Sequence, residues 1–63
     1  MNATEIYNEV KTKGVFTATN EAAGWYAISK DGYNMITFAD GSNKFYTLGA
    51  FAKRLRQLIN KGH

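Results

Sequence analysis

The sequence predicts a single α+β domain in which four antiparallel strands lie between a short N-terminal helix and a longer C-terminal helix. Apolar residues recur at helical spacing over residues 48–59. Two Asp-Gly pairs separate short runs that are rich in aromatic and β-branched residues, which is typical of hairpins. The chain has 63 residues and no cysteine, so it is one domain without disulfides. The predicted order is therefore α-β-β-β-β-α, over residues 1–63.

The first helix is predicted over residues 3–13. Asn2 is an N-cap candidate, and Glu5 three positions later completes a variant of the capping box. Thr4 is a second candidate for the N-cap. Gly14 stands where a left-handed residue commonly ends a helix. The apolar stripe of this helix is narrow and consists of Ala3, Ile6, Tyr7 and Val10.

The middle of the chain predicts a meander, because hairpins join neighbouring strands without a crossover. Asp31-Gly32 is a strong two-residue turn signal, and Asp40-Gly41 repeats it within a longer turn that includes Ser42. The strands are expected over residues 15–19, 25–29, 33–39 and 44–46.

The second helix is the clearest feature of the sequence. Thr47 is a candidate N-cap and Gly62 a candidate residue for the left-handed C-terminal position. The residues of its apolar stripe all fall on one face of a helical wheel: Leu48, Phe51, Ala52, Leu55, Leu58 and Ile59. We expect this face to pack on the sheet.

Alternation along the strands divides the sheet into two faces. The face expected under the C-terminal helix carries Phe16, Ala18, Tyr26, Ile28, Ile36, Phe38 and Phe45. The other face is expected to carry Trp25, Ala27, Tyr33, Met35, Thr37 and Tyr46. From this second face we take Trp25, Tyr33, Met35 and Tyr46 as candidate interface or stacking residues.

The second face has three candidate coverings. The N-terminal helix packs there, a second copy of the chain forms a homodimer there, or nucleotide bases stack on its rings. A plainer interpretation is that these rings belong to the core.

Charge is distributed unevenly along the chain, whose formal net charge is +3. All five acidic residues lie in residues 1–43, whereas residues 44–63 carry five cations and no acid. Such a basic end attracts polyanions, and its cations are candidate phosphate contacts. They are Lys44, Lys53, Arg54, Arg56 and Lys61. The alternative is that cations near the end of a helix complement its dipole and keep the protein in solution.

No constellation for catalysis is visible in the sequence. Glu5 and Glu9 are four residues apart and could share a helix face as an acid/base or metal-binding pair, but an ion pair of Glu9 with Lys13 is the preferred interpretation. The only histidine is the last residue, His63. We therefore expect no enzyme activity, no cofactor and no metal.

Two resemblances favour nucleic acid. The strand Trp25–Ile28 and the run Phe45–Phe51, which enters the helix through Leu48-Gly49-Ala50-Phe51, resemble the three-stranded integrase-arm DNA-binding module. The interval between these segments is longer here by about one hairpin, and the arginines of that family's strands are missing. Four strands followed by an amphipathic helix are also similar to single-strand-binding coactivator domains that act as dimers.

We therefore expect a small, non-enzymatic nucleic-acid-binding protein, DNA or RNA, that forms a homodimer. The alternative is a protein-interaction module, such as a small adaptor, an inhibitor or a phage-type accessory protein, whose sheet face docks a partner or a second copy. No run reaches the roughly 18 apolar residues of a membrane span, and no secretory signal is visible, so we expect no membrane contact and a cytoplasmic location.

Overall fold

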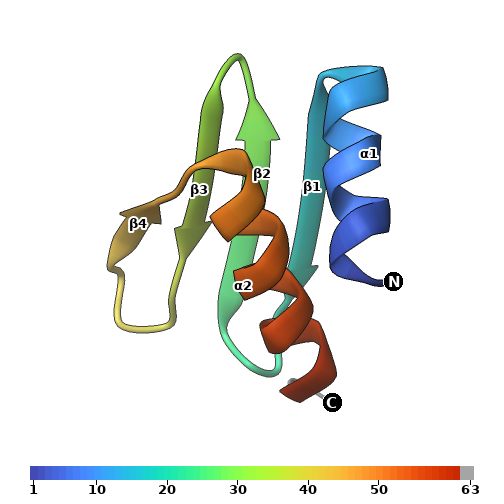
Figure 1. The fold of residues 1–63 in the computed structure, drawn as a ribbon. Coiled ribbons are helices and arrows are strands. Elements are labelled where there is room, and N and C mark those ends of the chain that lie inside the picture. Colours follow the sequence, from blue (N-terminus) through green and yellow to red (C-terminus); the bar gives the residue numbers. More distant parts are fainter. Residues whose placement is uncertain (62–63) are drawn as a thin grey trace.

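The computed structural model describes residues 1–61, so the predicted helix-ending Gly62 and the terminal His63 lie outside the described residues. It has the predicted α+β order, with a helix, four antiparallel strands in one sheet and a second helix (Figure 1). The elements are α1 (Ala3–Lys13), β1 (Val15–Asn20), β2 (Trp25–Lys30), β3 (Tyr33–Thr37), β4 (Asn43–Phe45) and α2 (Leu48–Lys61).

Both ends of α1 have the predicted caps. The Asn2 side chain accepts a hydrogen bond of 2.9 Å from the Glu5 N–H, and the Glu5 carboxylate accepts one of 3.0 Å from the Asn2 N–H. Gly14 ends the helix with φ of 76°, a conformation that glycine adopts without a steric cost. The helix start and stop are therefore encoded locally.

The sheet is a meander in the order β1-β2-β3-β4. The two-residue turn between β2 and β3 has φ of 53° at Asp31 and 83° at Gly32, which suits the twist of a tight hairpin. This turn pairs Lys30 with Tyr33, and every later pair of the hairpin follows from it.

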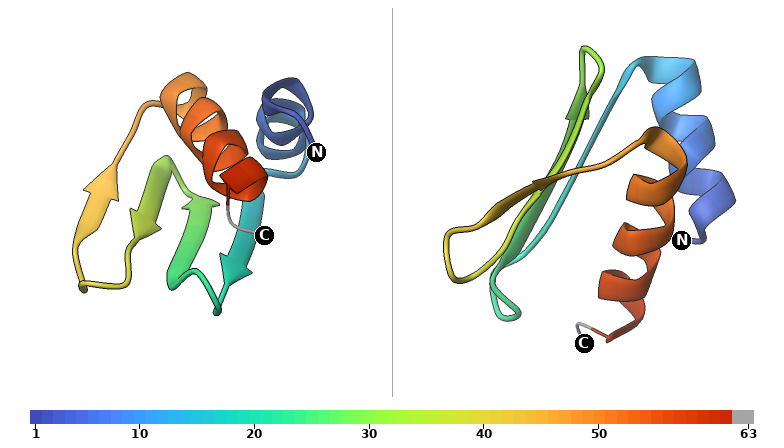
Figure 2. Two further views of the ribbon diagram at one scale, coloured as in Figure 1. Left: turned by 90° about the horizontal axis from the view of Figure 1, so that it is seen from below. Right: turned by 60° about the vertical axis from the view of Figure 1, so that its left-hand side comes forward.

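Both helices lie on the same face of the sheet, so the molecule has two layers (Figures 1 and 2). Helix α1 packs beside α2 and against β1. The side view in Figure 2 shows none of the elements within residues 1–61 on the other face of the sheet. The sequence-based alternative in which the N-terminal helix covers this face is therefore wrong.

The core lies between the sheet and the helices. From α2 it takes Phe51, Ala52 and Leu55, each at most 2% exposed, which confirms the predicted stripe. Ile6 of α1 is fully buried beside them. From the sheet the buried hydrophobic residues are Trp25, Ala27 and Ile36.

Candidate functional surfaces

The uncovered face of the sheet, called the open face below, consists of three cross-strand rows. One row joins Val15, Lys30 and Tyr33; the second joins Thr17, Ile28, Met35 and Phe45; the third joins Thr19, Tyr26, Thr37 and Asn43. Directly paired residues of an antiparallel sheet point to the same side, so these eleven side chains share one surface.

Large apolar side chains are unusually accessible on the open face. Tyr33 is 64% exposed and Phe45 is 62% exposed, and their ring centroids lie 6.2 Å apart. Tyr26 and Val15 are also exposed. A shallow hollow of about 330 Å³ lies toward the turn that joins β2 to β3, and its wall includes the rings of Tyr33 and Phe45. Its lining residues are Ile28, Lys30, Asp31, Tyr33, Met35 and Phe45.

The structure corrects the predicted faces of two strands. Trp25 and Ala27 are buried beneath the helices, whereas Tyr26 and Ile28 lie on the open face. The Nε1 of Trp25 is buried and has no hydrogen-bond partner among the described residues. Trp25 is therefore a core residue, and its ring is closed to a stacking partner.

The same inversion applies to β4 and the residue that follows it. Phe45 lies on the open face, whereas Tyr46 is half-buried and packs against the core. Asn34 holds Tyr46 in place: its carbonyl accepts a hydrogen bond of 2.9 Å from the Tyr46 N–H, and its Nδ2 donates one of 3.1 Å to the Tyr46 carbonyl. The buried Ser29 hydroxyl donates to the Asn34 side chain at 2.6 Å. Of the predicted interface residues, only Tyr33 and Met35 therefore share the open face.

A signal for the correct faces is present in the sequence. A two-residue turn at Asp31-Gly32 pairs Lys30 with Tyr33, and this register places Ile28 opposite Met35. Ile28 must then share the face of Met35. Hydropathy alone does not distinguish the two faces of β2, because each carries an aromatic and an apolar residue.

The second candidate surface is the outer side of α2. Lys53, Arg56 and Lys61 are exposed there, and Arg54 is half-buried. The Arg54 guanidinium lies 5.8 Å from the centroid of the Phe38 ring and donates a hydrogen bond of 3.2 Å to the Gln57 side chain. These contacts orient Arg54 on the flank that faces the end of β3. The structure therefore groups four of the five predicted phosphate contacts on one helix.

Lys44 is separate from this group. It lies on β4 opposite Ile36, on the helix side of the sheet, but neither α1 nor α2 covers β4 (Figure 2). The nearby Asp40 carboxylate accepts a 2.9 Å hydrogen bond from the Ser42 N–H. Hydrogen bonds from Ser42 chiefly lower the pKa of Asp40, and the charge of Lys44 adds a little. Lys44 therefore lies near a carboxylate and apart from the four cations of α2.

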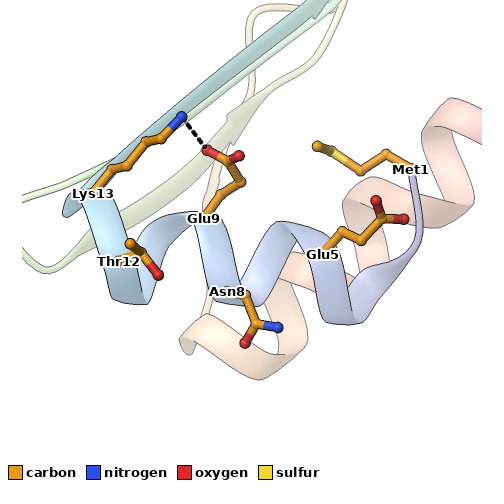
Figure 3. A pocket seen from close by; sticks show the side chains of 6 residues that line it. All are labelled: Met1, Glu5, Asn8, Glu9, Thr12 and Lys13. Carbon is orange, nitrogen blue, oxygen red and sulfur yellow. Dashed lines mark ion pairs between the residues drawn. The ribbon is translucent and has the colours of Figure 1, made fainter.

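The two carboxylates of α1 are engaged in different interactions, and Figure 3 shows both side chains and the ion pair of Glu9. Glu9 forms an ion pair of 3.1 Å with Lys13, as its spacing predicts, and Glu5 caps the helix start. They line a hollow of about 290 Å³. Within residues 1–61, no three His, Cys, Asp or Glu residues are grouped so that they could hold a metal ion.

Comparison of the chain with protein-family models, with curated proteins and with solved structures finds no match. In the part of the chain that the structure describes, no helix has the length and apolar character needed to cross a membrane.

Proposed function

We propose that the chain is a non-enzymatic nucleic-acid-binding protein whose phosphate-contacting surface is the outer side of α2. The observation that carries this proposal is the grouping of Lys53, Arg54, Arg56 and Lys61 on one helix that has no acidic residue. Clustered cations on one face of a small domain are the electrostatic signature of polyanion binding.

The position of the aromatic rings favours a duplex over a single strand. Proteins that bind single strands stack the bases on exposed rings within the basic groove. Here the three most exposed rings, those of Tyr26, Tyr33 and Phe45, lie on the open face, and α2 lies on the other layer. The fourth exposed ring, Tyr7, lies on α1 and is only 38% exposed. The helix α2 has 14 residues and is roughly 21 Å long. A row of cations of this length suits contact along the backbone of a duplex.

Salt-dependent anisotropy titration with labelled duplex and single-stranded oligonucleotides tests the proposal. Four phosphate contacts predict a log-log slope of roughly −3.6 for duplex DNA. We expect duplex binding that weakens with this slope and weaker single-strand binding. Absence of duplex binding at about 50 mM salt, or a slope near zero, would overturn the proposal.

The open face supports a second candidate function, the docking of a protein partner or of a second copy. The observation that favours it is the exposure of Tyr33 and Phe45 around an apolar hollow. Aromatic side chains are enriched among the residues that dominate binding energy at protein interfaces. Binding through this face would depend little on salt, which separates it from phosphate binding.

A further inference from the structure

We infer that the occupant of the open face is a second copy of this chain, which packs sheet against sheet around a two-fold axis. The inference uses the surface of the second candidate function and is independent of nucleic-acid binding by α2. It rests on the shape of the face, its charge, and its area.

The two ends of the open face differ in shape. The hollow bounded by Tyr33, Met35 and Phe45 lies toward the turn that joins β2 to β3. Tyr26 lies in the row at the other end and is 43% exposed. A two-fold axis that runs across the strands exchanges these ends. Each copy then places its Tyr26 row over the row of Lys30 and Tyr33 in the other, at the border of the hollow, and the two contacts are identical, as an isologous interface requires.

The charges of the molecule also permit this packing. Among the eleven residues of the open face, only Lys30 is charged, and Asp31 of opposite sign follows it at the rim. The cations of α2 lie on the other layer of each copy. Sheets that pack face to face are about 10 Å apart, so the two α2 helices stand further apart than the screening length of about 8 Å. Two copies with net charge +3 therefore meet at the face where repulsion is weakest.

The area of the face indicates which size class of interface it can form. A standard interface buries about 800 Å² per partner through about 20–30 residues. Eleven residues correspond to roughly half of that, which is the size of a reversible contact. We therefore expect a reversible monomer–dimer equilibrium, and not an obligate dimer.

Sedimentation equilibrium of the protein alone, from about 10 µM to about 1 mM, tests this inference. The mean mass of the wild-type chain should rise from 7.0 kDa toward twice that value. The double variant Tyr33→Ser, Phe45→Ser should stay monomeric over the whole range. Both side chains are more than 60% exposed, so the variant should keep the wild-type circular dichroism spectrum.

Two further variants control the result. Tyr7→Ser removes a ring that is 38% exposed on α1, away from the open face, and should dimerise like the wild type. Tyr26→Ser should weaken dimerisation about tenfold, because the two-fold packing uses that ring twice.

A wild-type mass that stays at 7.0 kDa at every concentration overturns the inference. Equal dimerisation by the Tyr33→Ser, Phe45→Ser variant overturns it as well, because the interface would then lie elsewhere. The sedimentation experiment contains no nucleic acid, so its result does not depend on the proposed function. If the chain stays monomeric in it but binds duplex with the expected salt slope in the titration, the dimer is refuted and the proposed function is not.

Discussion

Gly24 shows how one residue without a side chain joins two turns of the sheet. It ends the loop between β1 and β2 with φ of 81°, and its N–H donates a hydrogen bond of 2.8 Å to the Asn20 carbonyl. A Cβ at this position would lie 2.6 Å from the Cβ of Ala39, in the turn that follows β3. The loop therefore rests directly on that turn, at the edge of the core near Trp25.

Gly24→Ala should lower the free energy of unfolding by about 2–4 kcal/mol, because it combines a left-handed backbone with a steric clash. Gly41→Ala is a matched control. Gly41 has φ of 86°, but a Cβ there would meet no atom within 4 Å. It should cost only about 1–2 kcal/mol. Urea unfolding monitored by Trp25 fluorescence measures both values, and equal costs would show that the close approach to Ala39 contributes nothing.

At the scale of elements, α2 has one side that packs into the core and one side that carries charge. Phe51 and Leu55 are fully buried on one side, and the cations occupy the other. Thr47 marks the start of the helix, since its Oγ1 accepts a hydrogen bond of 3.3 Å from the Ala50 N–H. Substitutions on the outer side should therefore change binding without unfolding the domain.

Leu55→Asp should abolish cooperative folding, because it buries a carboxylate in the apolar core without a partner. Arg56→Asp is the matched control: it introduces the same aspartate at the next residue, which is exposed. That variant should keep a cooperative thermal transition within a few degrees of the wild type. Thermal melts followed by circular dichroism would compare the two, and a folded Leu55→Asp variant would show that the face of α2 is assigned wrongly.

The elements were predictable because their signals are local. Caps and helical periodicity located α1 and α2, and the Asp-Gly turns separated the strands. The predicted third strand, over residues 33–39, was too long, because a turn begins after Thr37. In that turn the Phe38 N–H donates to the Ser42 carbonyl, and the Gly41 N–H donates to the Phe38 carbonyl.

The faces of β2 and β4 were less predictable from hydropathy. Each of the two faces of β2 carries an aromatic and an apolar residue: Trp25 and Ala27 on one, Tyr26 and Ile28 on the other. Tertiary packing decided between them, since Ala27 pairs with Ile36 in the core row beneath the helices. For this reason only half of the predicted interface set, Tyr33 and Met35, shares the open face. Phe45, the other strongly exposed ring of the open face, was expected on the face under the C-terminal helix.

At the scale of the whole molecule, two surfaces of different chemistry lie on opposite layers. The outer side of α2 is basic, and the open face is apolar and almost uncharged. In the dimer we infer, the two basic surfaces point away from each other. Such a dimer would bridge two duplexes, whereas a dimer that reads two half-sites on one duplex requires both helices on the same side.

The most direct test of the central claim is to remove one surface at a time and repeat the duplex titration at several salt concentrations. The double variant with Lys53→Gln and Arg56→Gln should weaken duplex binding and reduce the magnitude of the log-log salt slope by about 2. Tyr33→Ser, Phe45→Ser should leave both the affinity and the slope at their wild-type values, at protein concentrations where the chain is monomeric. The reverse result, in which the open-face variant loses binding and the α2 variant keeps it, would contradict the account.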